Sequence, residues 1–143
     1  MRLPDVNVLL HAANLASPRC VVAARWLEGA ADPGRGLALP WVSLLGFIRL
    51  ATRPGGYSVP MTLPQAMSLV DGWLGAPGAR VVHPGPGHAR MLNELLRGAG
   101  TAGNLTTDAH LAALALEHGA TVGTFDRDFQ RFSGVRVDWL GQN

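Results

Sequence analysis

Short apolar segments alternate with longer stretches of helical periodicity along almost the whole chain. A short helix is expected at residues 8–13, behind a turn at Asp5 and Asn7, and apolar residues recur at helical spacing in five further stretches. These stretches are residues 18–30, 41–52, 64–74, 87–96 and 108–118. Apolar runs of strand length lie at residues 2–4, 37–39, 79–82, 121–125 and 135–140. Strands that alternate with helices predict an α/β fold with a mainly parallel sheet.

The chain has the length of one domain. No linker, repeat or low-complexity segment divides its 143 residues, so we expect one domain over residues 1–143. With 48% hydrophobic and only 15% charged residues, apolar surface should remain for a homodimer contact or a bound partner. Cys20, the one cysteine, excludes an internal disulfide. Since neither a signal peptide nor a membrane-spanning apolar run is visible, we expect a cytoplasmic protein without membrane contact.

The positions of the ten acidic residues suggest a metal site. Asp5 ends the first expected strand, Asp126 and Asp128 follow the strand at residues 121–125, and Asp108 opens a helix. Ligand sites of parallel sheets form outside the carboxyl ends of the strands. Convergence of Asp5, Asp108 and Asp126 would create an oxygen-rich pocket suited to Mg²⁺ or Mn²⁺. Each aspartate taken alone is explained more simply as a helix-start or turn residue, and only the set favours a metal.

Four segments resemble a known family. LPDVNVLLHA (3–12), GNLTTDAHLAALALEHGA (103–120) and VGTFDRDFQRF (122–132) resemble the three acidic motifs of VapC-type PIN domains. LPWVSLLGFIRLATRPG (39–55) is similar to a VapC subfamily common in mycobacteria and related high-GC bacteria. The resemblance implies a three-layer α/β/α PIN-like domain that cuts RNA with Mg²⁺ or Mn²⁺, as the toxin of a VapBC toxin-antitoxin pair.

The same resemblance implies roles for individual residues. Asp5 and Asp108 would be the principal metal ligands, Asp126 would complete the catalytic set, and Asp128 would be an outer carboxylate. The polar positions that would line the pocket are Asn7, Asn104 and Thr124. The candidates for contact with RNA phosphate are Arg49 and Arg53, for which a solvated helix face is an equally good explanation.

The segment at residues 39–55 departs from the family pattern. Many PIN domains carry a glutamate in this helix, and its place falls on Gly46; no acidic residue occurs between Asp32 and Asp71. A site with one carboxylate fewer should hold its cation more weakly. The alternative function is therefore a weakly active or inactive PIN-like module that binds RNA or protein.

Other residue types are weaker guides. A net charge of +2 does not by itself indicate nucleic-acid binding. All twelve basic residues are arginine, which base composition explains, although arginine suits RNA phosphate. The side chains of His110 and Asp108 diverge on a helix, so the five histidines are better explained as exposed or core residues. The tryptophans, at positions 26, 41, 73 and 139, fit core or interface positions better than base-stacking positions.

The partners follow from the resemblance. A VapC-like toxin would pair with a small VapB-like antitoxin, whose C-terminal segment would occupy the active-site groove. The RNA would be a tRNA or rRNA loop, because proteins read unpaired bases in RNA. Two other classes with carboxylates at strand ends fit poorly. A phosphoacceptor receiver domain needs a lysine, which the chain lacks, and a haloacid-dehalogenase-type phosphatase needs an aspartate where Asn7 stands.

Overall fold

The computed structural model describes residues 1–141, so the expected domain range of 1–143 ends two residues beyond the described part. The described chain forms five strands, six α-helices and two short 3₁₀ helices. In chain order they are β1 (Arg2–Pro4), α1 (Val6–Ala12), α2 (Cys20–Ala31), β2 (Leu37–Leu39), α3 (Trp41–Thr52), α4 (Leu63–Leu74), β3 (Ala79–Val81), α5 (His88–Ala99), η1 (Gly103–Leu105), α6 (Thr106–His118), β4 (Thr121–Thr124), η2 (Arg127–Arg131) and β5 (Val137–Trp139).

The strands form one sheet with the order β3-β2-β1-β4-β5, and every neighbouring pair is parallel. β1 is central, with Arg2 opposite both Leu37 of β2 and Thr121 of β4. The chain builds one half of the sheet outward from β1 and then returns to build the other half from β4. The direction of strand addition therefore reverses between β1 and β4, where ligand sites of open parallel sheets form.

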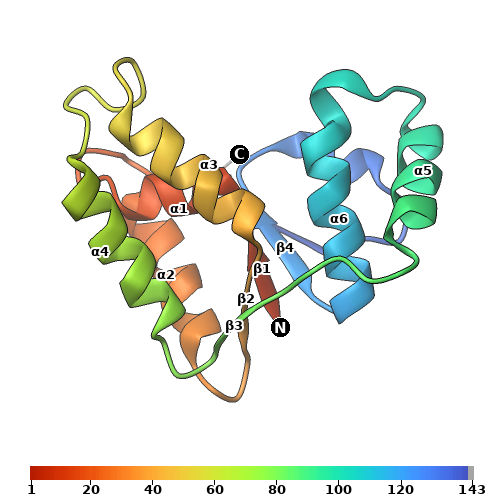
Figure 1. Ribbon diagram of the computed structural model, residues 1–143, viewed down its shortest axis with the longest axis horizontal. Helices are drawn as coiled ribbons and strands as arrows, with labels where there is room; N and C mark the ends of the chain where they lie inside the picture. Colours follow the sequence, from red (N-terminus) through yellow and green to blue (C-terminus); the bar gives the residue numbers. More distant parts are fainter. Residues whose placement is uncertain (142–143) are drawn as a thin grey trace.

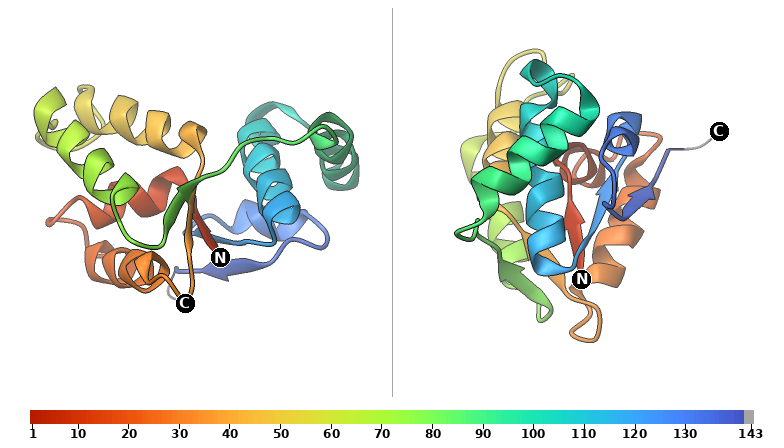
Figure 2. Two further views of the ribbon diagram at one scale, coloured as in Figure 1. Left: turned by 60° about the horizontal axis from the view of Figure 1, so that its bottom comes forward. Right: turned by 90° about the vertical axis from the view of Figure 1, so that its right-hand side faces the viewer.

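Helices cover both faces of the sheet, which confirms the expected three-layer α/β/α arrangement. Helices α1 to α4 lie on one side of the sheet and α5 and α6 on the other (Figures 1 and 2). The buried residues form two clusters that match these two layers. On β2, Leu37 and Leu39 pack into the cluster of α1 to α4 and Ala38 packs into the other, as the alternation of strand side chains requires. Both faces of β2 are thus buried.

Local signals at the helix ends explain where several elements begin and stop. The Asp5 side chain accepts a hydrogen bond from the Val6 amide, so α1 begins two residues before the position expected from its apolar pattern. The 3₁₀ turn of η1 leads directly into α6, which starts at Thr106 rather than at Asp108. Gly119 ends α6 with a φ of 64°, which confirms the expected left-handed cap.

A chain of polar contacts joins α5 to α6. His88, the first residue of α5, hydrogen-bonds through Nδ1 to Glu117 of α6, and its Nε2 lies 2.8 Å from Nδ1 of His110. Glu117 also accepts a hydrogen bond of 2.6 Å from the Gly85 amide. Burial alone would raise the pKa of Glu117, but the hydrogen bonds from His88 and Gly85 hold this pKa below its ordinary value. These contacts fix the loop before α5, and α5 itself, onto α6.

Candidate metal centre

Asp5 lies immediately beyond the central strand β1 and is only 7% exposed. Its Oδ1 accepts a 2.7 Å hydrogen bond from the Val6 amide, and its Oδ2 accepts from Asn7 Nδ2 and from the Thr124 hydroxyl. Because a carboxylate oxygen has two lone pairs, Oδ2 is saturated and Oδ1 keeps one free acceptor position. Burial raises the pKa of Asp5, and the hydrogen bond from Thr124 opposes this shift.

Thr124, the last residue of β4, connects Asp5 to the neighbouring strand end. Its fully buried hydroxyl donates to Asp5 at 2.8 Å and accepts from the Asp126 amide at 2.9 Å and from Asn7 Nδ2 at 3.3 Å. Asn7 in turn accepts from the Phe125 amide through its side-chain oxygen. Two of the three sequence-predicted polar residues, Asn7 and Thr124, therefore brace the carboxyl edges of β1 and β4 against each other.

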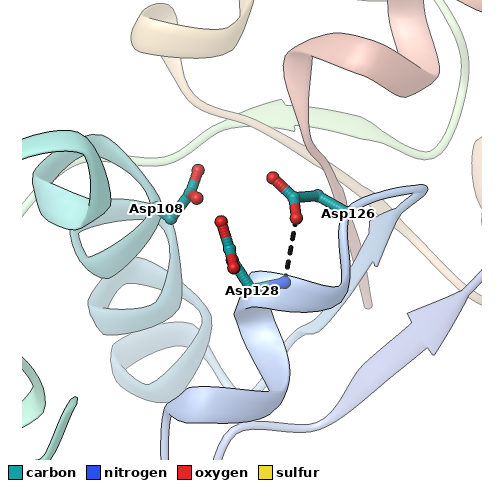
Figure 3. A group of neighbouring side chains, drawn as sticks. All are labelled: Asp108, Asp126 and Asp128. Carbon is teal, nitrogen blue, oxygen red and sulfur yellow. Dashed lines mark hydrogen bonds between the residues drawn. The ribbon is translucent and has the colours of Figure 1, made fainter.

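Three further aspartates bring their carboxylates together beside this edge. One oxygen from each of Asp108, Asp126 and Asp128 lies within 4.8 Å of the other two. Figure 3 shows Asp108 projecting from α6 toward Asp126, which precedes η2, and Asp128, which lies on η2. The Asp126 side chain caps η2 by accepting from the Asp128 amide at 2.9 Å. Among the described residues this tight group contains Asp128, expected as an outer carboxylate, and does not contain Asp5.

Asp5 nevertheless belongs to the same electrostatic environment. Burial and the negative charges of Asp5, Asp126 and Asp128 raise the pKa of Asp108 to about 7. Asp126 likewise contributes to the raised pKa of Asp5. Four carboxylates that repel one another this strongly are a donor set of oxygens only, as Mg²⁺ and Mn²⁺ prefer. The residues present therefore fit a divalent cation, which would neutralise their repulsion.

A cavity of about 590 Å³ opens from Asp5 and Asp108 toward α3. Its other lining residues are Val6, Val42, Leu45, Gly46, Arg49, Leu50 and Thr107. Arg49, one of the two candidates for phosphate contact, lines the cavity, whereas Arg53 follows the end of α3 and is not among the lining residues. Asn104 is exposed on η1 and also lies outside the lining.

Gly46 forms part of the cavity wall, and the structure shows how little space a side chain would have there. A Cβ atom at this position would lie 2.7 Å from Val6 Cγ2, closer than real Cβ contacts allow. A side chain at the place where many PIN domains carry a glutamate would therefore require the Val6 side chain to move. The apolar lining from α3 was not predicted from the sequence, because helical spacing looks the same whether a helix face covers a core or a cavity.

Sheet order and acidic edge together define a class of protein: three-layer α/β/α domains with a carboxylate centre at the point where strand addition reverses. The chain belongs to the PIN domain family, whose model matches residues 2–135. It is 45% identical to Ribonuclease VapC37 of Mycobacterium tuberculosis over 138 residues, which cover 96% of each chain. It is 33% identical to Ribonuclease VapC33 of the same species over 136 residues and 95% of each chain. The expected likeness to VapC-type PIN domains is therefore confirmed.

Solved structures support the fold. VapBC2 from Rickettsia felis, bound to a promoter DNA fragment, matches with a TM-score of 0.71 at 17% identity over 96% of each chain. The M. tuberculosis VapC20 toxin, which cleaves the sarcin-ricin loop, matches with a TM-score of 0.68 at 21% identity, over 95% of this chain and 99% of that one. Within the described residues, none of the helices has the length and apolar character needed to cross a bilayer.

Proposed function

We propose that this protein is a divalent-metal-dependent endoribonuclease and the toxin of a VapBC pair. The observation that carries this proposal is the meeting of Asp108, Asp126 and Asp128 beside buried Asp5, in a chain 45% identical to a protein named as a ribonuclease. Asp5, Asp108 and Asp126 are the catalytic carboxylates. Asp128 adds a fourth carboxylate to the site, in a protein whose α3 provides none.

Each part of the site has a separate task in this mechanism. A bound Mg²⁺ or Mn²⁺ would polarise a phosphoryl oxygen and lower the pKa of a water molecule for in-line attack. Thr124 and Asn7 hold Asp5 in one orientation, so that its carboxylate needs little reorganisation when a cation binds. Arg49 on the cavity wall provides positive charge for a phosphate of the RNA. Arg53, which follows the end of α3, contacts phosphate of the flanking RNA.

The test is cleavage of total RNA with Mg²⁺, Mn²⁺ or a chelator. We expect wild type to shorten RNA only when a cation is present, and Asp5→Asn to remain folded and inactive. The alternative, a PIN-like module that binds without cutting, is favoured by the absence of a carboxylate at Gly46. A binding module would shift RNA in a gel and leave its length unchanged with either cation, which would overturn the nuclease proposal.

The partners of this function are a VapB-like antitoxin, an RNA with an exposed loop in a tRNA or rRNA, and a second copy of the chain in a homodimer, all in the cytoplasm. Exposed apolar residues on the α3 and α4 side, including Leu45 and Leu63, provide surface for such contacts. We expect co-expression with the product of an adjacent antitoxin gene to relieve growth inhibition. Toxicity that persists when the two proteins form a complex would contradict the toxin-antitoxin assignment.

A further inference from the structure

Two histidine rings face each other between α5 and α6, apart from the acidic centre. Nε2 of His88 lies 2.8 Å from Nδ1 of His110, and the planes of the two rings meet at 73°. His110 follows Asp108 by two residues, so the two side chains leave α6 on opposite sides. The histidine pair and the carboxylates are therefore two separate groups, one on each side of the same helix.

Glu117 determines which ring nitrogen of His88 carries a proton. The pKa of Glu117 lies below its ordinary value, so its side chain is an ionised carboxylate that only accepts hydrogen bonds. Nδ1 of His88 must therefore donate to Glu117, which leaves a lone pair on Nε2 of the neutral ring, directed at His110. The Gly85 amide fixes Glu117 in turn through a hydrogen bond of 2.6 Å. A histidine that donates one ring N–H to a carboxylate and presents the other nitrogen is arranged as metal-ligating histidines are.

The distance between the two ring nitrogens is close to that of two ligands on one ion. Zinc binds imidazole nitrogen at about 2.0–2.1 Å, so two nitrogens at a tetrahedral angle lie about 3.3 Å apart. The pair would have to open by about 0.5 Å, which small rotations of the two side chains supply. The side chain of His88 is 12% exposed and His110 is half-buried, so an ion can reach them from solvent.

We propose that His88 and His110 form a second metal site, which binds Zn²⁺ through Nε2 of His88 and Nδ1 of His110 and links α5 to α6. The ion replaces the proton that lies between the two rings, and Nε2 of His110 takes up a proton instead. Glu117 orients His88 and offsets part of the positive charge. Nitrogen ligands favour Zn²⁺, whereas the oxygen ligands of the acidic centre suit Mg²⁺ and Mn²⁺.

The site has two protein ligands, and water completes its coordination. In the described part of the chain, the one set of three ligand side chains that converge is the acidic group of Asp108, Asp126 and Asp128. The histidine pair should therefore hold Zn²⁺ less tightly than a structural zinc site with four protein ligands. Zinc at this site would add a bond between α5 and α6 to the hydrogen bonds already present, and so would stabilise the folded chain.

The experiment is a Zn²⁺ titration of the full chain by calorimetry, with excess Mg²⁺ to compete for the acidic centre. His88→Gln and His110→Asn keep a polar group near each ligating nitrogen, and we expect both to weaken Zn²⁺ binding more than about tenfold. Glu117→Gln removes the charge that orients His88 and should weaken binding about tenfold. The matched control is His118→Gln, at an exposed histidine on the same helix, which should bind Zn²⁺ like wild type.

Asp108→Asn separates this proposal from the metal centre of the nuclease. It should weaken Mn²⁺ binding and leave Zn²⁺ affinity unchanged, whereas His88→Gln should do the reverse. Thermal melts should show that Zn²⁺ raises the Tm of wild type and not that of His88→Gln, and they also show that the variant is folded. A chain that binds Zn²⁺ at the histidines but no Mn²⁺ would refute the acidic centre alone. Equal Zn²⁺ affinity of wild type and both histidine variants, or an equal loss in His118→Gln and His88→Gln, would overturn the histidine site.

Discussion

Asp108 is the residue through which pH should act most directly on stability. Its folded pKa of about 7 exceeds the ordinary 3.8, so the metal-free fold is penalised above pH 7 and the penalty disappears as pH falls toward 4. We predict that Asp108→Asn is more stable than wild type by about 1 to 2 kcal/mol at pH 8, after solvent screening is allowed for, and equal to it near pH 4. Urea denaturation without metal at both pH values measures this difference, with exposed Asp71→Asn as the control. A gain of the same size at both values would contradict the prediction.

Thr124 is the residue on which the geometry of Asp5 depends. Thr124→Val keeps the shape of this fully buried side chain. It removes the donor of the hydrogen bond to Asp5 and the acceptor of the hydrogen bonds from the Asp126 amide and from Asn7. We expect a loss of about 1 to 3 kcal/mol in the free energy of unfolding. Weaker Mn²⁺ binding at pH 7 should accompany it, because loss of the donated hydrogen bond raises the pKa of Asp5 further.

Thr124→Ser is the matched control for this prediction, since it keeps the hydroxyl group. Chemical denaturation and Mn²⁺ titration by calorimetry should show Thr124→Ser close to wild type. If the valine and serine variants behave alike, the hydroxyl does not position Asp5.

Between elements, the close approach of α3 to α1 at Gly46 and Val6 decides whether a further carboxylate fits. We predict that Gly46→Glu costs about 1 to 3 kcal/mol of stability through overpacking and does not improve Mn²⁺ affinity. Gly46→Glu combined with Val6→Ala should recover stability and bind Mn²⁺ more tightly than wild type. Thermal melts and calorimetry of both variants, with Val6→Ala alone as control, test this. Tighter Mn²⁺ binding by Gly46→Glu alone would contradict the prediction, because it would show that the Val6 side chain moves aside at little cost.

His88 joins α5 to α6 through two separate contacts, which can be tested one at a time. Asn at this position imitates Nδ1 and keeps the bond to Glu117, whereas Gln imitates Nε2 and keeps the bond to His110. We predict that His88→Ala loses about 1 to 3 kcal/mol, because it leaves partly buried groups without partners, and that each amide variant recovers part of this loss. Urea denaturation measures the effect, with exposed His83→Ala as the control. Equal stability of the two alanine variants would show that the contact contributes nothing.

Most helices and strands could be predicted because the sequence patterns that indicate them are local, whereas the elements that were not predicted depend on tertiary contacts. Strands such as β2 follow from short apolar runs, and helices such as α3 follow from apolar residues at helical spacing. The 3₁₀ helices η1 and η2 have no such period and were not predicted. For the site, the edge rule for parallel strands placed Asp5 near Asp126. It could not reveal that Asp128, and not Asp5, forms the tight group with Asp108 and Asp126, since that depends on how η2 turns.

For the whole molecule, metal binding and folding should be linked. A cation that binds only the folded chain at 100 times its Kd adds about 2.7 kcal/mol to stability. We predict that Mn²⁺ raises the Tm, and does so more at pH 8 than at pH 6, because Asp108 with its pKa of about 7 must lose a proton to bind. Thermal melts at both pH values test this prediction, and Asp5→Asn should show a smaller rise. An equal rise at both pH values would exclude a role for the Asp108 proton.

The central position of β1 has a consequence for when the protein becomes active. Asp5 is among the first ten residues and Asp126 among the last twenty, and they become neighbours only when β4 pairs with β1. Translation delivers the amino-terminal half first, and that half alone contains neither Asp108 nor Asp126. Under the proposed nuclease function, a nascent chain on the ribosome should therefore leave surrounding RNA intact until synthesis is almost complete, so that an inhibitor made beforehand has time to meet each new copy.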